Sequence, residues 1–262
     1  MVSIEGVKFQ YDAAGPVLSF PDFSCAQGDR MLLLGNSGAG KTTLLHLLCG
    51  LLTPIAGALT VGSKSLHTST DRELDRWRGT EVGVIFQQAH FVQSLTVREN
   101  LALPHQLTAG RVPEGLTTKM DDMLDRLGIG HRAGARPHEL SVGEQQRASI
   151  ARALLHNPKV VFADEPTSAL DDESAAAVMD ILDREAADAT LVVVTHDQRL
   201  KNRYASCVTS IPCGHEPWGD HTSLAEFASQ APANGIEPRL VGLWGGHGQP
   251  DASDRKAGQR RV

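Results

Sequence analysis

Long hydrophobic runs are absent from this sequence. The longest strongly apolar stretch, residues 44–52, is interrupted by His46 and is far shorter than the ~20 residues that a membrane-spanning helix needs. The first residues also lack the charged start, apolar core and cleavage site of a secretory signal. We therefore expect a chain that does not span a bilayer and is not marked for secretion.

A broad basic face and closely spaced cysteine pairs are missing too. The net charge is −6, which argues against nucleic acid as a partner. The cysteines show no CxxC spacing, so we expect reduced thiols rather than a disulfide framework or a metal site. What remains is an ordinary globular composition, 41% hydrophobic and 21% charged, in a chain of 262 residues. The cysteines are Cys25, Cys49, Cys207 and Cys213.

The N-terminal part predicts strands followed by a loop and a helix. Residues 2–11 place apolar side chains at near-alternate positions, and residues 17–23 are apolar again after a turn-rich stretch. That pattern indicates an antiparallel β element. Residues 30–34 form a short apolar run that stops at a glycine-rich loop, and residues 42–52 predict a helix ended before Pro54.

The middle of the chain predicts a mainly helical insertion, which we place at about residues 95–145. The pattern there is helical and charged, with breaks expected at Pro104, Pro113 and Gly128.

The next segment predicts a βαβ unit. Residues 160–163 are wholly apolar, which is typical of a strand buried on both faces of a parallel sheet. A helical apolar spacing follows at residues 175–182, and residues 191–194 are again apolar. Beyond Ile211 the composition shifts to Gly, Pro, Ala and His, so residues 212–262 are expected to form a poorly ordered tail.

The loop at residues 35–42 fits the pattern GxxxxGK[ST] between a predicted strand and a predicted helix. Its glycines let backbone N–H groups approach phosphates, Lys41 reaches the terminal phosphates, and the Thr42 hydroxyl is suited to Mg²⁺. The sequence therefore predicts a nucleotide site. Its expected contacts are Gly35, Asn36, Ser37, Gly38, Ala39, Gly40, Lys41, Thr42 and Thr43.

A second motif lies at residues 140–147, which read LSVGEQQR. It is close to the LSGGQQR signature of ATP-binding cassette (ABC) ATPases, although Val142 replaces a glycine and Glu144 the glutamine. With the P-loop and the acidic pair Asp164-Glu165, it makes the chain resemble that family over roughly residues 1–210. The resemblance implies an α/β fold: a P-loop NTPase core with a mainly parallel sheet, an N-terminal antiparallel β subdomain and a helical insertion subdomain.

The resemblance also implies roles for residues after the strands. Asp164 would hold Mg²⁺ through water, and Glu165 would polarise the attacking water as general base. His196, after the next strand, would sense the γ-phosphate. Gln87 would reach Mg²⁺ from the loop after an apolar strand, with Gln88 as its competitor for that role.

Other matching positions concern adenine and a second subunit. Tyr11 resembles the aromatic residue that stacks on adenine, although it can equally be a packing residue. Ser141 and Gly143 would donate hydrogen bonds to the γ-phosphate of a partner subunit's ATP. Glu144 stands where the signature glutamine makes a contact across the dimer, and a carboxylate is electrostatically less suited to that place.

We therefore expect residues 1–211 to form the ABC ATPase domain, which binds ATP and Mg²⁺ and works as a homodimer through its nucleotide sites. The segment from Gln87 to Leu101 resembles the lipoprotein-release, macrolide-export and cell-division group of cassettes. The resemblance implies a location at the cytoplasmic face of the membrane, on an integral-membrane permease. We place the docking surface near Phe91, Val92 and Leu95, which can alternatively be core residues of the helical insertion.

Two other function classes fit less well. A soluble ABC ATPase that acts on DNA or ribosomes usually carries long coiled coils, zinc modules or two cassettes, and none is visible in this sequence. A P-loop kinase or GTPase is disfavoured by the signature and by the lack of an NKxD-like motif.

Overall fold

A parallel sheet forms the centre of the fold. The computed structural model describes residues 1–35, 38–109, 112–204 and 208–210. Along the sheet the strands run in the order β10-β4-β9-β8-β7, and every neighbouring pair is parallel. Its strands are β4 (Arg30–Leu34), β7 (Val82–Ile85), β8 (Val160–Asp164), β9 (Thr190–Thr195) and β10 (Val208–Ser210).

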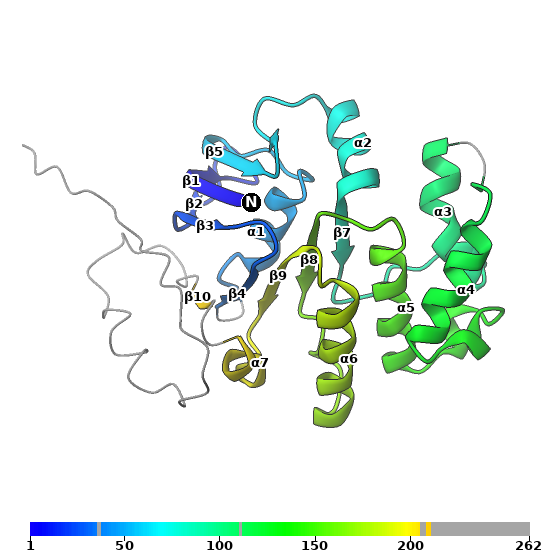
Figure 1. The fold of residues 1–262 in the computed structure, drawn as a ribbon. Coiled ribbons are helices and arrows are strands. Elements are labelled where there is room, and N and C mark those ends of the chain that lie inside the picture. The colour runs from blue at the N-terminus through cyan, green and yellow to red at the C-terminus, as the bar shows by residue number, and fades with distance from the viewer. Residues whose placement is uncertain (36–37, 110–111, 205–207, 211–262) are drawn as a thin grey trace, which may run out of the picture.

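An antiparallel sheet from the N-terminal part lies beside it (Figure 1). The order is β2-β1-β5-β6, with β3 also paired to β1. The antiparallel element predicted at the N-terminus is therefore confirmed, while β5 and β6 extend it with residues for which no strand was predicted. Its strands are β1 (Val2–Phe9), β2 (Leu18–Ser19), β3 (Phe23–Cys25), β5 (Ala56–Val61) and β6 (Lys64–Ser65).

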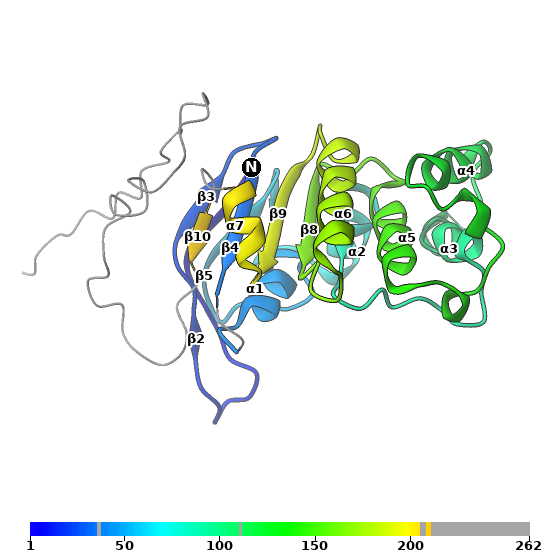
Figure 2. The same ribbon diagram turned by 90° about the horizontal axis from the view of Figure 1, so that it is seen from below.

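Helices connect and cover the strands. Both views place α3 and α4 at the far end of the molecule from the antiparallel sheet (Figures 1 and 2). None of the helices among the described residues is long and apolar enough to cross a membrane. The helices are α1 (Lys41–Leu48), α2 (Asp71–Glu81), α3 (Val97–Ala109), α4 (Leu116–Arg126), η1 (Gly130–Arg132), η2 (Pro137–Glu139), α5 (Val142–Leu154), α6 (Asp172–Glu185) and α7 (Gln198–Arg203).

Two helix predictions were wrong. The helix after the glycine loop ends at Leu48 and not at residue 52, because Gly50 takes a left-handed φ of 63° that terminates it. Pro104 does not break the insertion, since it lies inside α3. Burial of its neighbours Leu101 and Ala102 in the core stabilises α3 despite the missing backbone N–H of the proline.

Strands β4, β8 and β9 are buried on both faces, as the apolar run at residues 160–163 predicted for β8. Alternate residues of β4, β8 and β9 face two different hydrophobic clusters. Leu32 belongs to the cluster with α5, α6 and α7, whereas its neighbour Leu33 belongs to the cluster with α1 and the antiparallel sheet. The carboxyl ends of these strands are therefore held rigidly between two packed layers.

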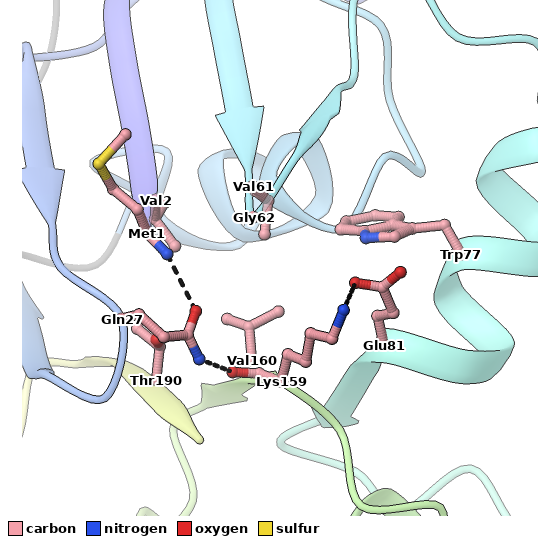
Figure 3. Close-up of a pocket in the computed structure, with 10 residues that line it drawn as sticks. All are labelled: Met1, Val2, Gln27, Val61, Gly62, Trp77, Glu81, Lys159, Val160 and Thr190. Atoms are coloured by element: carbon pink, nitrogen blue, oxygen red, sulfur yellow. Dashed lines mark hydrogen bonds and ion pairs between the residues drawn. The ribbon is translucent and has the colours of Figure 1, made fainter. Parts of the chain in front are cut away.

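A chain of hydrogen bonds fastens the two sheets at the amino-terminal ends of the parallel strands (Figure 3). The Met1 amine donates to Gln27 Oε1 at 3.0 Å, Gln27 Nε2 donates to the Lys159 carbonyl at 3.0 Å, and Lys159 pairs with Glu81 at 3.0 Å. The hollow between these residues measures about 10 Å³. It has room for about one water molecule and is too small for a nucleotide.

Candidate functional site

The glycine loop joins β4 to the start of α1. Gly38 and Gly40 have φ of 82° and 83°, which residues with a side chain rarely adopt. Gly40 is the N-cap of α1 and provides no side-chain cap, so the first N–H groups of the helix remain available to an anion. Asn36 and Ser37 lie outside the described residues.

Lys41 begins α1 and points back over the loop. Its ammonium group donates to the Gly35 carbonyl at 2.9 Å and lies 3.7 Å from Glu165 Oε1. Only 8% of Lys41 is exposed. A buried cation therefore lies between the glycine loop and the acidic end of β8.

Asp164 ends β8 directly beside Thr42. The Thr42 hydroxyl donates to Asp164 Oδ2 at 3.0 Å. Asp164 Oδ1 is buried and has no hydrogen-bond partner in the described part of the chain. Burial raises the pKa of this carboxyl above its ordinary value, and the Thr42 hydrogen bond opposes the shift. One buried oxygen ligand is thus left unsatisfied next to a hydroxyl, a pairing that suits a hard cation such as Mg²⁺.

Glu165 is held by the neighbouring strand β9. Its carboxylate accepts hydrogen bonds from the Thr195 hydroxyl at 2.7 Å and from the His196 backbone N–H at 3.1 Å, and it contacts His196 Nδ1 at 2.7 Å. The backbone of Glu165 has a left-handed φ of 47°, which is uncommon for a residue with a side chain. The sequence motifs predicted Glu165 and His196 at this edge but gave no role to Thr195.

Gln87 follows β7 at the same edge of the sheet. Its side-chain amide donates to the Ser168 hydroxyl at 3.4 Å, and that hydroxyl donates to the Glu165 carbonyl at 3.1 Å. Gln87 is exposed, and so is the competing Gln88. Ser168 therefore connects the Gln87 side chain to the backbone of Glu165 by two hydrogen bonds.

Tyr11 lies at the surface next to the first turn of α1. Tyr11 is 63% exposed, and its ring meets Phe9 edge to face, with 4.7 Å between the ring centroids. Its hydroxyl is 2.8 Å from Thr43 Oγ1. The structure thus places Tyr11 beside the glycine-loop helix with most of its surface accessible.

The motif at residues 140–147 forms the start of α5. Ser141 is the N-cap of the helix, and its hydroxyl accepts a hydrogen bond from Glu144 N at 3.3 Å. In return, Glu144 Oε2 accepts from Ser141 N at 2.8 Å. Val142 is 55% exposed, and a side chain added at Gly143 would meet nothing closer than 3.9 Å. Ser141, Val142 and Gly143 therefore form an accessible helix start.

Glu144 also contacts an arginine of its own chain, which the resemblance did not imply. Its second oxygen, Oε1, accepts from Arg132 Nε at 2.8 Å, and only 9% of the residue is exposed. Arg132 and the backbone of Ser141 lower the pKa of this carboxyl to about 2. Both oxygens therefore bind groups of the same chain. The spacing Ser141-x-x-Glu144 is that of a capping box, a sequence signal that would have predicted this contact.

Comparison with known proteins decides the family. A family model described as ABC transporter matches residues 18–168. The lipoprotein-releasing system ATP-binding protein LolD of Colwellia psychrerythraea is 34% identical over 233 residues, which are 87% of this chain and 90% of that protein. The chain belongs to the ABC transporter family.

Other members of the family agree. LolD of Legionella pneumophila is 39% identical over 189 residues, with 71% of this chain and 83% of the relative covered. The uncharacterized ABC transporter ATP-binding protein YvcR of Bacillus subtilis is 41% identical over 182 residues, 69% of this chain and 70% of the relative. This cassette is therefore an ATP-binding and ATP-hydrolysing subunit, and the predicted fold class is confirmed.

Solved structures of cassettes resemble it closely. A dimeric structure of the ATP-binding cassette MJ0796, in a post-hydrolysis state with ADP and Pi, has a TM-score of 0.71 and 28% identity. The match covers 83% of this chain and 98% of that chain. The structure of cbiO1 from Clostridium perfringens has a TM-score of 0.69 and 26% identity, covering 80% of this chain and 84% of that chain.

Within one subunit of this cassette, the predicted site residues fall into two groups. Lys41, Thr42, Asp164, Glu165 and His196 are linked by contacts of 2.7 to 3.7 Å. No hydrogen bond or ion pair among the described residues joins Ser141 or Gly143 to that group. The single chain therefore keeps these two groups of residues apart.

Proposed function

We propose that two copies of this ABC ATPase together hydrolyse Mg-ATP to drive a separate integral-membrane permease of the lipoprotein-release or export type. The observation that carries the proposal is the carboxylate pair at the end of β8. Asp164 has an unsatisfied oxygen beside Thr42, and Glu165 is held in place by Thr195 and His196. Such an arrangement can hold a cation and orient a water molecule at the same time.

The residues around Asp164 fit Mg²⁺. Asp164, the Thr42 hydroxyl and the Gln87 side chain offer oxygen ligands, which Mg²⁺ prefers, and Mg²⁺ usually keeps several waters besides one or two carboxylates. When bound, the ion neutralises charge that develops on the phosphate oxygens. Thr42 already donates to Asp164, so the hydroxyl oxygen and the carboxylate stand next to each other.

Glu165 is the proposed general base. The Thr195 hydroxyl and the His196 N–H fix its carboxylate. The carboxylate therefore needs little reorganisation energy when the reaction occurs. His196 is assigned to the γ-phosphate and to the position of the attacking water. Its ring lies 2.7 Å from Glu165 and remains 61% exposed in the single chain, which leaves it accessible to nucleotide.

The proposed ATP contacts surround the open N-terminus of α1. The backbone of the glycine loop would bind the phosphates, Lys41 would supply a positive charge, and Tyr11 would stack on adenine. The exposure of Tyr11 beside Thr43 supports this role. The proposed binding residues are Tyr11, Gly35, Asn36, Ser37, Gly38, Ala39, Gly40, Lys41, Thr42 and Thr43.

The second half of each site is proposed to come from the partner subunit. Ser141 and Gly143 lie at the accessible start of α5, where backbone N–H groups and the helix dipole favour an anion. Glu144 is assigned to the capping box and not to the nucleotide. The relation to cassettes solved as dimers supports a homodimer that closes the glycine loop of one subunit against α5 of the other.

The proposed permease contact uses the exposed part of the segment after Gln87. Val92 is 43% exposed, whereas Phe91 is 8% exposed and packs in the core cluster. Phe91 is therefore a core residue of the helical insertion. The proposed apolar contact with the permease is made by Val92 and the half-buried Leu95. Relatives named as lipoprotein-releasing ATP-binding proteins support a permease partner and a peripheral position at the cytoplasmic face of the membrane.

Mixing two variants tests the shared site. Ser141→Arg blocks the α5 half of a site, and Lys41→Ala removes the charge in the glycine loop. Each homodimer should be inactive, whereas a mixed dimer regains one Lys41 opposite one Ser141. We expect hydrolysis to recover on mixing, measured as phosphate release. Absence of recovery, with mixed dimers shown to form by mass spectrometry, would contradict the proposed arrangement.

Co-purification with the permease tests the docking surface. Val92→Ser should reduce capture of a membrane protein from detergent extracts while the ATPase activity of the isolated subunit stays the same. Leu107→Ser is the matched control, because Leu107 is also an exposed apolar residue of the helical region, at 78% exposure. Equal capture by both variants would rule out Val92 as the contact.

A further inference from the structure

Arg152 makes an unusual set of contacts with the segment that follows Gln87. It lies in the last turn of α5, which begins next to Ser141. Its guanidinium donates from Nη2 to the Ala89 carbonyl at 2.5 Å and from Nη1 to the His90 carbonyl at 3.1 Å. The same group lies over the Phe91 ring, 4.7 Å from its centroid. One side chain therefore holds three consecutive residues.

This segment needs such support because its backbone is unusual. His90 has a left-handed φ of 44°, a conformation that residues with a side chain seldom adopt unless their surroundings fix it. The turn lets Gln87 stay at the edge of the sheet while Phe91 enters the core. On its other side, the His90 ring packs edge to face on Phe86, at 5.4 Å between centroids.

The position of Arg152 links the two halves of the proposed site. Arg152 stands 11 residues after Ser141 along α5, about 16 Å at the rise of a helix. An α-helix transmits a displacement at one end to the other because it is rigid over this length. A movement of the Gln87 segment would therefore reach Ser141 through Arg152 and α5.

We propose that Arg152 is a positioning residue that clasps the Gln87 segment to α5, so that the metal-facing glutamine and the signature serine move as one unit. The proposal rests on the role assigned to Gln87 above. An arginine suits the task because its planar fork donates to two carbonyls and stacks on a ring at once, which lysine cannot do.

Kinetics and hydrogen exchange of Arg152→Met test the clasp. The variant keeps an unbranched apolar stem and loses the charge and all donors. We expect kcat to fall roughly 10- to 100-fold, because a misplaced group loses catalytic effect steeply with distance. KM for Mg-ATP should change little. Amide exchange of residues 87–92 should be faster without nucleotide, a readout that does not depend on turnover.

Arg78→Met is the matched control. Arg78 also lies in the last turn of its helix, α2, and donates to two backbone carbonyls, those of Gly50 at 2.6 Å and Cys49 at 3.4 Å. It should lower the melting temperature without the loss in kcat. Arg152→Lys keeps the charge and one donor nitrogen and should recover part of the activity. It replaces Arg152→Met if that variant does not fold.

A double mutant separates the clasp from the proposed function. If Arg152 acts through Gln87, Gln87→Ala should add no further loss to Arg152→Met. Losses that multiply, or a wild-type kcat in folded Arg152→Met beside an impaired Gln87→Ala, would overturn the clasp alone. A wild-type kcat in Gln87→Ala would instead overturn the role proposed for Gln87.

Discussion

The end of β8 and the start of α5 each bury a glutamate to a similar depth, yet the two regions differ in what their carboxylates leave open. Glu165 is 8% exposed and Glu144 9%. Beside Glu165, Asp164 keeps one oxygen without a partner in the described chain, and its pKa is raised. Glu144 has a partner for each oxygen, and its pKa is lowered to about 2.

The difference shows which of the two regions needs a bound ligand to satisfy its buried polar groups. At β8, the folded chain tolerates an unsatisfied buried carboxylate, which costs stability until a ligand binds. At α5, the carboxylate completes the fold and requires nothing further. A similar depth of burial therefore occurs at the proposed catalytic site and at a helix cap. The oxygen without a partner on Asp164, next to Glu165, distinguishes the first region from the second.

The largest expected effect is that of Glu165→Gln. The change removes the proposed general base and should lower the hydrolysis rate by on the order of 10²–10⁴ while ATP binding persists. The variant should accumulate as an ATP-bound dimer, which light scattering with Mg-ATP measures. If the variant is a monomer under these conditions, or its turnover is near wild type, Glu165 would not be the general base, and the proposed functional difference between Glu165 and Glu144 would be wrong.

Asp164→Asn should separate function from stability. A bound metal ion stabilises the transition state by several kcal/mol, and Asp164→Asn would lose this effect. Hydrolysis should therefore fall by at least about 10²-fold. The raised pKa of Asp164 means that its ionised form destabilises the fold at neutral pH. The neutral amide should therefore raise the melting temperature without nucleotide. A lower melting temperature in differential scanning calorimetry would show that the ionised Asp164 carboxylate does not destabilise the folded state.

Glu144→Gln should have a smaller effect, on stability alone. The amide loses the charge that faces Arg132, and we expect about 1 kcal/mol less free energy of unfolding, measured by urea denaturation. KM for ATP should remain near wild type. Glu139→Gln is the control, since Glu139 accepts from Arg136 N in a capping box of its own but is exposed. A rise in KM specific to Glu144→Gln would restore a nucleotide contact for this residue.

The smallest effect concerns pH. Because the folded pKa of Glu144 is about 2 and its ordinary value is 4.5, its contribution to stability is fully present above about pH 4.5. The contribution is lost as the pH falls from there toward 2. The stability difference between wild type and Glu144→Gln should therefore be constant from pH 8 to 5. A difference that changes with pH within that range would assign the effect to another group.

The order of motifs along the chain was enough to predict one edge of the sheet. Asp164-Glu165 follows one apolar run and His196 the next, and the carboxyl ends of parallel strands meet at the same edge. The glycine loop follows a third such run. Period and glycine placement are local properties, so the sequence itself predicted the strands, the glycine loop and the βαβ unit. The fold class and the roles of these site residues came from the resemblance to ABC ATPases.

Elements without an apolar period were missed. The helix α2 is mostly polar, and only its capping box of Thr70 and Glu73 marks its start. Strand β5 is half exposed and pairs with β1, and β6 has only two residues and pairs with β5. Pro104 is tolerated in α3 because packing outweighs the lost hydrogen bond.

The sequence by itself determined that Asp164-Glu165 and His196 follow apolar strands and that the glycine loop stands between a strand and a helix. Only the tertiary structure decided which partners the side chains contact and which of them are buried. Glu144 faces Arg132 from the preceding η1, and Phe91 is buried under Arg152 while its neighbour Val92 is exposed. The reason is physical: backbone periodicity is encoded within a few residues, whereas the partner that satisfies a charge or covers a ring comes from a distant part of the chain.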